Sequence, residues 1–458
     1  MSVQPVESRV ALPFSSTVAG AAPLTWGQKA VLQDIRETGF SLNASGAQAV
    51  AEGATVESLA ARLNSLVSRH PALRVRLDTD AQGKDSQVVV GSGEIAVEVM
   101  DFGADDDPDE VGKYIDQLWL DWLMTPFDHY RDLPIRFGVV RYDGEAIYQV
   151  PCYNHLVIDG TAITLLMSEF TTGELVGGGM HLLDLVERER TPQALKANDR
   201  SLHYWESNLR DIPPRTFGET IHVDGRQGKR FWHSRFSSPA AHLAVLSIAR
   251  RTGMDTSRVL FAIMATALGR AVGHSTLTAK VISSNRFRPG LAEVIAPIAQ
   301  NSLVTVDLAG ATVDEVVARG RRALLAGGMH AYYDPERLTE LMARLDAERG
   351  YQAQVSCRIN DRRMTTRRMV DEQARTAEVT MDQIIQKLPE TWFSWDGTLD
   401  HLHEQAFITV EDHGDTVHLQ LIFDMGCFTE EQIENFAHGV EQVAIEAAFD
   451  PDAPAGCG

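Results

Sequence analysis

The amino-acid sequence predicts an α+β fold built as two successive halves. Three observations lead to this prediction. A chain of 458 residues exceeds what a single hydrophobic core usually holds, so at least two domains are expected. A hydrophobic fraction of 44% supplies enough apolar side chains for two large cores. Segments with the period of a helix and segments with the period of a strand occur in both halves.

The first half, residues 1–178, combines helices with a series of strands. An acidic loop at residues 104–110 supplies the cap of one helix. Residues 171–179 (TTGELVGGG) lack the Gly-Lys-Ser/Thr ending of a phosphate loop, so we interpret them as a linker. The expected helices are 27–37, 55–69 and 111–124, and the expected strands are 74–77, 87–90, 95–99, 135–141 and 146–153.

The second half, residues 179–458, repeats the mixture of helices and strands. A turn at residues 413–414 joins two late strands, and an amphipathic helix closes the chain. The expected helices are 240–251, 257–272, 313–326 and 430–448, and the expected strands are 277–283, 304–308, 405–411 and 416–423.

Charge and hydropathy exclude several classes of protein. Lys and Arg number 42 against 63 Asp and Glu, and the resulting net charge of -21 argues against nucleic acid as the main partner. No apolar run approaches the roughly 18 residues of a membrane span. The N-terminus lacks the basic-then-apolar pattern of a signal peptide. We therefore expect a soluble cytoplasmic protein without a membrane partner.

The four cysteines are scattered and form no C-x-x-C pair. Neither a zinc site nor a disulfide framework is predicted, and a reducing compartment suits them. Cys152 lies three residues before a histidine, His155, but positions i and i+3 of a strand face opposite sides. We interpret Cys152 as a buried apolar residue rather than a nucleophile.

The segment richest in chemistry is 153–160 (YNHLVIDG), between the strand 146–153 and a helical pattern that starts at Thr161. His155 would follow the strand end, where an imidazole can act as a general base near neutral pH. Gly160 permits a tight turn, and amides at the helix start can hold an oxyanion. A histidine that is only hydrogen-bonded in the core is the competing interpretation.

The order of segments along the chain resembles the condensation-domain family of nonribosomal peptide synthetases, relatives of chloramphenicol acetyltransferase. The signature of that family is His-His-x-x-x-Asp-Gly. Residues 154–160 keep the second histidine, the acid and the glycine, and Asn154 replaces the first histidine. Segments in matching order are 24–28 (LTWGQ), 68–74 (SRHPALR), 203–205 (HYW), 284–286 (SNR), 298–303 (IAQNSL), 396–400 (DGTLD) and 410–415 (VEDHGD).

The resemblance implies two chloramphenicol-acetyltransferase-like lobes arranged as a V, with the active site in a tunnel between them. The N-terminal lobe would be residues 1–178, which carry the motif. The C-terminal lobe would be residues 179–458, with latch and bridging segments. The implied activity is acyl transfer from a thioester to an amine or hydroxyl, which forms an amide or an ester in natural-product biosynthesis.

The resemblance also assigns roles around the motif. His155 would orient or deprotonate the nucleophile, amides near Gly160 would hold the oxyanion, and Asn154 would preserve hydrogen bonding without titrating. In the family the acid of the motif pairs with an arginine. Asp159 is therefore expected to be structural, with Arg286 as its partner, and removal of one member would leave a buried charge unpaired.

Two further residues are implied as lining of the substrate tunnel, Trp26 and Asn301. Core packing explains Trp26 equally well. The segment that contains His70 is mainly structural in the family.

Five arginines lie close together in the sequence, Arg358, Arg362, Arg363, Arg367 and Arg368. In an acidic protein such a patch can receive an acidic partner or a phosphate. A solvated surface is the alternative. The resemblance implies an acyl or peptidyl carrier protein as the partner, with Arg358, Arg362 and Arg363 as the binding residues.

The expected cofactor is not intrinsic to the chain: the phosphopantetheine arm of the carrier, or coenzyme A, delivers the donor, and no metal is expected. Nothing in the sequence resembles an adenylation domain or a carrier protein. We therefore expect a free-standing enzyme, with a domain cut from a larger synthetase as the alternative.

Two other functions stay open on the sequence. Asn154 would suit a catalytically silent relative that docks carrier proteins or partner enzymes. An epimerisation-type member would need one carrier-bound substrate and an acid opposite His155.

Overall fold

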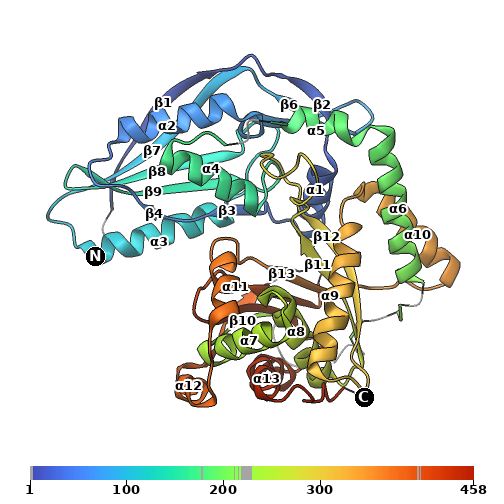
Figure 1. The fold of residues 1–458 in the computed structure, drawn as a ribbon. Coiled ribbons are helices and arrows are strands. Elements are labelled where there is room, and N and C mark those ends of the chain that lie inside the picture. Colours follow the sequence, from blue (N-terminus) through green and yellow to red (C-terminus); the bar gives the residue numbers. More distant parts are fainter. Residues whose placement is uncertain are drawn as a thin grey trace. The chain divides into compact units, whose positions relative to one another are not determined.

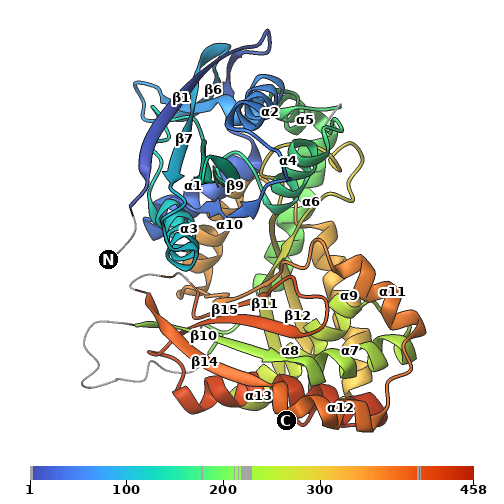
Figure 2. The same cartoon turned by 90° about the vertical axis from the view of Figure 1, so that its left-hand side faces the viewer.

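The chain folds into two units, each with its own large β-sheet (Figures 1 and 2). The computed structural model describes residues 4–176, 179–210, 212–214, 216–217, 230–399, 402 and 404–457. The first unit comprises Met1–Lys196 and Ser284–Ala299, and the second comprises Ala197–Ser283 and Gln300–Gly458. The predicted α+β class with two sheet-bearing halves is confirmed.

The first unit contains a six-stranded sheet and a smaller three-stranded sheet. In the large sheet β7 and β8 are parallel, and the other neighbours are antiparallel. Its order is β1 (Val6–Ser15), β7 (Ser92–Phe102), β8 (Ile135–Tyr142), β9 (Glu145–Asn154) and β3 (Asn43–Ser45), with β4 (Gln48–Ala49) also beside β9. The small sheet runs β2 (Gly20–Pro23), β6 (Asp85–Val89) and β5 (Val75–Thr79).

Helices cover both faces of the large sheet. Successive residues of β8 point to opposite faces: the Phe137 ring lies 5.3 Å from Phe170 of one helix, whereas Gly138 faces Trp122 of another. The helices are α1 (Trp26–Thr38), α2 (Val56–Arg69), α3 (Pro108–Met124), α4 (Gly160–Thr172) and α5 (Leu182–Glu189), with a 3-10 turn at Pro71–Arg74.

Local sequence explains where these helices begin. Thr25 and Thr55 form capping boxes with Gln28 and Ser58, so two orphan N–H groups are satisfied at each start. Asp107 caps α3, which opens with Pro108 at a position where proline costs no hydrogen bond.

The second unit is built on a seven-stranded sheet. Its strands are β12 (Gln300–Asp307), β11 (Thr276–Ser283), β13 (Cys357–Asp361), β15 (Ala406–Val410), β16 (Val417–Asp424), β10 (Phe231–Ser238) and β14 (Trp392–Leu399), in that order. β13 is parallel to both of its neighbours. The parallel pairing requires long connections, and these carry α9 (Val313–Met329), α10 (Pro335–Arg349) and α11 (Arg367–Thr376).

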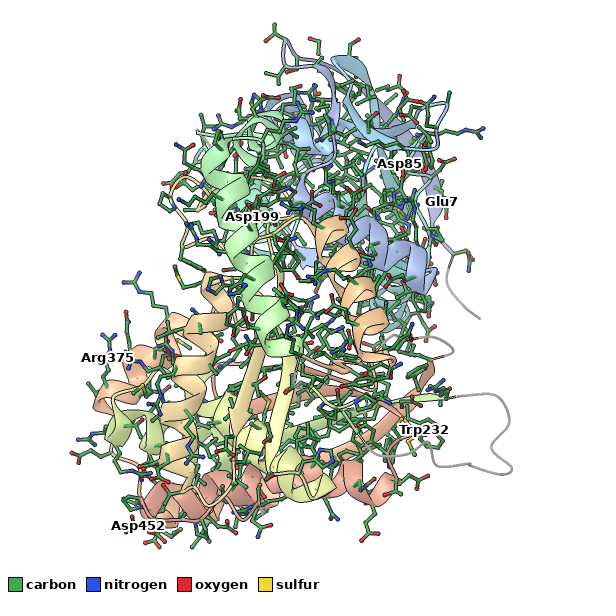
Figure 3. The ribbon with its side chains drawn as sticks, turned by 90° about the vertical axis from the view of Figure 1, so that its right-hand side faces the viewer. Glu7, Asp85, Asp199, Trp232, Arg375 and Asp452 are labelled. Atoms are coloured by element: carbon green, nitrogen blue, oxygen red, sulfur yellow. The ribbon has the colours of Figure 1, made fainter. Side chains whose placement is uncertain are left out.

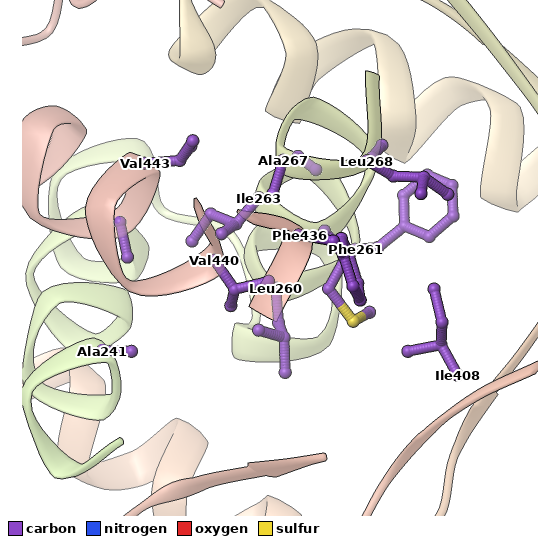
Figure 4. Packing of buried hydrophobic residues seen from close by; sticks show 14 of the residues in the cluster. Ala241, Leu260, Phe261, Ile263, Ala267, Leu268, Ile408, Phe436, Val440 and Val443 are labelled. Carbon is purple, nitrogen blue, oxygen red and sulfur yellow. The ribbon is translucent and has the colours of Figure 1, made fainter. Parts of the chain in front are cut away.

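A side of this sheet is packed against helices, and α8 is the most buried of them (Figures 1 and 2). Leu260, Ile263 and Ala267 of α8 meet Phe436 and Val440 of the last helix, as Figure 4 shows. The helices are α6 (Pro192–Leu209), α7 (Pro239–Thr252), α8 (Thr256–Val272), α9 (Val313–Met329), α10 (Pro335–Arg349), α11 (Arg367–Thr376), α12 (Met381–Lys387) and α13 (Glu430–Phe449), with a 3-10 turn at Leu388–Glu390.

The expected helices and strands are present, with ends shifted by a few residues. The structure adds elements that sequence analysis missed. β1 was missed because most of its residues are exposed, which weakens an alternating pattern. α5 and α6 were not among the expected helices, and Asp199 of α6 is labelled in Figure 3.

The glycine-rich linker begins where α4 ends. Gly173 closes α4 with a φ of 75°, the left-handed cap that glycine favours. The expected boundary after residue 178 falls at residues 177–178, outside the described residues. Residues 179–196 pack with the first unit.

Candidate functional site

The motif forms the predicted junction of a strand and a helix. β9 ends at Asn154 and α4 begins at Gly160, so His155 to Asp159 make the turn between them. The whole junction belongs to the first unit. Ile158 and Val157 are fully buried and hold the turn in the core.

His155 is half-buried and fixed by two contacts. Its backbone N–H donates to the Leu42 carbonyl at 2.9 Å, and its Nδ1 lies 3.0 Å from the Ile158 carbonyl. A carbonyl oxygen only accepts hydrogen bonds, so Nδ1 carries the proton of the neutral ring. Nε2 is then the basic nitrogen. This tautomer suits a general base that works through Nε2.

Leu42, which accepts the hydrogen bond from the His155 N–H, has an unusual backbone conformation. Its φ is 49°, in the left-handed region that a leucine rarely adopts. Such strain persists only where the surroundings impose it, and it is common at functional sites. Sequence analysis gave no signal for Leu42.

Asn154 is fully buried, and both ends of its side chain are engaged. Its Nδ2 donates to the Ser41 carbonyl at 2.6 Å and to Asn43 Oδ1 at 3.0 Å. Its Oδ1 accepts the Leu156 N–H at 3.0 Å. A neutral histidine offers one donor and one acceptor on a ring, whereas the amide offers two donors and an acceptor. Asn154 thus ties the motif turn to residues 41–43.

Asp159 is the centre of the site's hydrogen bonding. Its Oδ1 accepts the Ala162 N–H at 2.9 Å, which caps α4, and also binds Arg286 Nη2 at 2.5 Å. Its Oδ2 accepts the N–H groups of Ile298 and Ala299 at 2.9 and 3.1 Å. The ion pair that we expected between Asp159 and Arg286 is present, and both side chains are 9% exposed.

Arg286 continues this network into its own loop. Its guanidinium donates to the carbonyls of Leu291, Val294 and Ala296. The preceding residue, Asn285, has a φ of 57° and donates to the Ile298 carbonyl. The ion pair between Asp159 and Arg286 therefore ties the segment Ser284–Ala299 to the motif turn within the first unit.

Gly27 allows the same segment to approach α1. A Cβ at this position would lie 1.6 Å from the Pro297 carbonyl oxygen, so no other residue fits without moving the backbone. The next residue before it, Trp26, is 5% exposed, and its N–H donates to Glu189 at 2.9 Å. The Leu-Thr-Trp-Gly-Gln segment is thus a packing element of the first unit.

The expected oxyanion site near Gly160 stays a prediction, and the structure shows which amides could form it. The Ala162 amide is taken by Asp159, which leaves the N–H groups of Gly160 and Thr161 at the start of α4. Both residues are half-buried. A helix N-terminus favours an anion, although the nearby carboxylate of Asp159 opposes it unless Arg286 neutralises that charge.

The Arg-His-Pro-Ala-Leu-Arg segment is structural. His70 Nε2 lies 3.0 Å from Glu169 near the end of α4. Burial lowers the His70 pKa below its ordinary value, and the nearby Glu169 offsets only part of this shift. Arg74 is fully buried and donates to the carbonyls of Val67, Val18 and Val90. Glu169 was not found from the sequence, because a single acid on an apolar helix gives no pattern.

Cys152 does not behave as a nucleophile in the structure. It is fully buried, and burial raises its pKa to about 11, so the reactive thiolate is scarce near neutral pH. Its Sγ contacts the Trp122 carbonyl. The other cysteines are also buried, and none of the four forms a disulfide.

The two residues implied as tunnel lining belong to different units. Trp26 lies in the first unit and Asn301 in the second, on β12 beside Ile282 of β11. The Asn301 carbonyl accepts the Tyr333 hydroxyl at 3.1 Å. Their role in a tunnel stays a prediction.

The arginines of residues 358–368, here called the arginine segment, lie in different environments. Arg363 is 6% exposed and binds Asp361, while Arg358 pairs with Glu404, a carboxylate that is 2% exposed. Arg362 is 55% exposed and pairs with Glu411. Arg368, on α11, is 91% exposed. Arg358 and Arg363 therefore serve the core of the second unit, and the accessible charge lies on Arg362 and α11.

Two properties of the described residues bear on cofactors and membranes. Their His, Cys, Asp and Glu side chains form no group of three or more suited to a metal ion. Among the helices of this described part, none is long and apolar enough to cross a bilayer.

Comparisons with known proteins agree with the motif. The sequence model of the condensation domain family matches residues 18–456. Cyclosporin synthetase of Tolypocladium inflatum is 25% identical over 280 residues, which are 57% of this chain and 2% of that far longer protein.

Solved structures share the fold over nearly the whole chain. The SgcC5 protein from Streptomyces globisporus superposes with a TM-score of 0.70 at 19% identity, over 94% of this chain and 100% of its own. The X-domain from teicoplanin biosynthesis gives 0.66 at 17% identity, over 95% of this chain and 96% of its own. The predicted lobes of the chloramphenicol-acetyltransferase type are thereby confirmed as the fold. The chain belongs to the condensation domain family.

Proposed function

We propose that the protein is an acyltransferase that forms an amide or an ester from an acyl thioester held on a carrier protein. The observation that carries the proposal is the contact of 3.0 Å between His155 Nδ1 and the Ile158 carbonyl, which favours a basic Nε2, in a turn held by Asp159 and Arg286. A histidine held in this way is prepared to act as a base before any substrate binds.

In the proposed reaction His155 Nε2 accepts the proton of the amine or hydroxyl as that group attacks the thioester carbonyl. The new C–N or C–O bond forms, and the C–S bond breaks when the tetrahedral intermediate collapses. The proton passes to the departing sulfur, so the products are the acylated acceptor and the free phosphopantetheine thiol. The donor could also be a coenzyme A thioester, which presents the same arm.

The oxyanion of the intermediate would be held by the Gly160 and Thr161 amides. The removal of an oxyanion donor in other enzymes costs roughly 10² to 10³ in rate. Asn154 takes no part in proton transfer in this proposal, because its amide is engaged with residues 41–43 and cannot titrate.

The carrier protein would meet the basic surface made by Arg362, Arg367 and Arg368. Arg362 and Arg368 are well exposed, and Met364 and Met369 in the same segment are 43% and 54% exposed. Methionine adapts to different apolar partners, and arginine suits acidic or phosphorylated ones. This surface replaces Arg358 and Arg363 as the proposed contact.

A catalytically silent docking function is the second candidate. The replacement of the first motif histidine by Asn154 and the fold match to an X-domain favour it. In that case the motif turn at residues 154–160 would have only a structural role, and the protein would bind carriers without acyl transfer.

The test is acyl transfer from a panel of acyl-phosphopantetheine carriers to a pool of amines and alcohols, followed by intact mass. We compare wild type with His155→Ala, and with His203→Ala as a control, since His203 is exposed on α6. A general base contributes roughly 10² to 10⁴ in rate, so His155→Ala should lose that much product.

The outcomes separate the candidates. Product that depends on His155 but not on His203 supports the acyltransferase. Carriers that bind wild type without any acylated acceptor support the docking function. Product formed equally by His155→Ala and wild type rules out His155 as the base.

A further inference from the structure

A cavity of about 540 Å³ lies in the first unit, on the sheet face that α3 covers. It is lined by strands β1, β7 and β8, by α3, and by the loop at residues 127–133. Drug-sized ligands occupy pockets of about 300–1,000 Å³, so this cavity can hold a small organic molecule. None of the motif residues 154–160 lines it.

The cavity exists because α3 covers only part of the sheet. α3 packs against β3 and β9, so the face of β7 nearer to β1 is left open. Successive side chains of β7 point to opposite faces of the sheet. The side chains of Ile95, Val97 and Val99 are buried on the face away from α3, whereas those of Ala96 and Glu98 are half-buried on the face toward the cavity.

One wall of the cavity is apolar. Gly138 of β8 lets this wall approach the sheet closely, because a Cβ there would lie 3.0 Å from both the Met100 methyl and the Trp122 ring. Tyr114, Leu118 and Trp122 of α3 are spaced by four residues, so they line one wall as a row. All three are half-buried, as expected for side chains that face an open cavity.

The two ends of the cavity differ in charge. At one end lies Glu7 of β1, which is labelled in Figure 3, close to Tyr114. At the other end lie Arg76, Arg131 and Arg136. Between them, Arg9 and Glu98 face each other across β1 and β7 at 3.5 Å and neutralise one another.

Arg76 is the decisive residue. Its Nε is sealed from solvent and has no hydrogen-bond partner within the described residues. No described carboxylate forms an ion pair with its guanidinium, which belongs to β5 and is half-buried. A buried donor without a partner is costly, so it is expected to meet an acceptor in the working protein.

Its neighbours are already engaged. Arg136 donates to the carbonyls of Thr125 and Pro126 at 2.7 and 2.6 Å and stacks on Phe127 at 3.8 Å. The carboxylate of Asp132 accepts the Asp128 N–H. Arg131 pairs with Asp128 at 3.8 Å and its side chain is 87% exposed, so Arg76 is the partly buried arginine at this end whose guanidinium has no ion pair within the described residues.

We propose that this cavity binds a small organic anion with an aromatic or apolar body. The anionic group, a carboxylate or its equivalent, pairs with Arg76, and the body lies along Tyr114, Leu118 and Trp122. The site is separate from the motif turn, and it does not depend on the proposed acyl transfer.

The test uses 8-anilinonaphthalene-1-sulfonate, an aromatic anion whose fluorescence reports binding, and its uncharged analogue N-phenyl-1-naphthylamine. Both are titrated into wild type, Arg76→Gln, Ala96→Phe and Arg190→Gln, and thermal unfolding verifies that each variant is folded. Arg190 is a matched control, because it lies in the same unit and is 57% exposed.

We expect Arg76→Gln to bind the sulfonate about tenfold more weakly, since a charge-assisted hydrogen bond is lost. Binding of the neutral analogue should be unchanged by that substitution. Ala96→Phe fills the cavity and should weaken both dyes, whereas Arg190→Gln should match wild type. Wild-type sulfonate affinity in a folded Arg76→Gln or a folded Ala96→Phe overturns the proposal.

Discussion

The motif turn at residues 154–160 and the arginine segment at residues 358–368 are both short windows dense in reactive side chains, yet the fold treats them differently. In the turn, one local structure is held together by the hydrogen bonds of Asn154, His155 and Asp159. In the arginine segment, Arg358 and Arg363 contact different partners in different parts of the second unit.

The difference follows from the backbone. The turn reverses the chain, so polar groups separated by a few residues bind the same few amides and carbonyls. In the other segment, β13 sends alternate side chains to opposite faces, and Arg363 then reaches Ser257 at the start of α8. Nearness in sequence therefore indicates a shared site only where the chain turns back on itself.

The sharpest test of the turn is Asp159→Ala. It leaves Arg286 buried without its partner and also removes the cap of α4, so we expect a loss of about 3–5 kcal/mol in unfolding free energy. Urea unfolding and soluble yield measure it, with Asp105→Ala in an exposed loop as the control. A variant with wild-type stability that is merely slow would move Asp159 from a structural role to a catalytic one.

The arginine segment can be tested through His242 of α7. Burial and the nearby Arg363 lower the His242 pKa to about 4, while Asp415 raises it. The unfolded histidine takes up its proton near pH 6.5, so the folded state loses stability as the pH falls from about 6.5 to about 4. The loss should reach roughly 3 kcal/mol at the low end of that window.

Unfolding free energies of wild type and His242→Leu at pH 7 to 4 measure this loss. His242→Leu should lack this part of the pH dependence, whereas the exposed His203→Leu should keep it. Parallel profiles for wild type and His242→Leu would show that burial and the nearby Arg363 do not lower the His242 pKa in the folded protein.

A smaller loss of unfolding free energy is expected for Asn154→Ala. The substitution leaves the Leu156 N–H and the Ser41 carbonyl unpaired in the core, which should cost about 2 kcal/mol. Asn208→Ala is the control, because its side chain donates only to the Tyr204 carbonyl on half-buried α6. An unfolding midpoint equal to wild type would mean that the turn does not need Asn154.

The smallest effect on stability is expected for Arg362→Gln combined with Arg368→Gln. Both arginines are exposed, and surface ion pairs contribute roughly 0–1 kcal/mol each. Carrier affinity should fall and become less dependent on salt, and Lys113→Gln combined with Arg190→Gln is the charge-matched control, since both side chains are exposed. Unchanged carrier affinity would remove this surface from the proposed function.

Much of the fold was accessible from the sequence because periodicity is a local property. The capped helices α2, α7 and α8 and the strand–turn–helix of the motif were predicted to within a few residues. β1 was missed, since an exposed edge strand needs no apolar alternation. α6 and α10 were missed although their buried residues recur with the period of a helix, as Leu338, Leu341 and Leu345 do in α10.

Some residues of the candidate site could also be named from the sequence, and others could not. His155, Asp159 and Gly160 could be named from the motif, and Arg286 could be named from the family resemblance. Ser41, Leu42 and Asn43 could not, because they reach the motif over more than 100 residues of sequence and carry no pattern of their own.

The sequence by itself determined the α+β class, the family and the position of the motif, since these depend on local period, composition and short spacing. Tertiary structure alone decided which nitrogen of His155 is basic, that Asn154 is a structural residue, and that Arg363 is buried. Hydrogen-bond partners and burial are set by segments distant in the chain, and only folding brings those segments together.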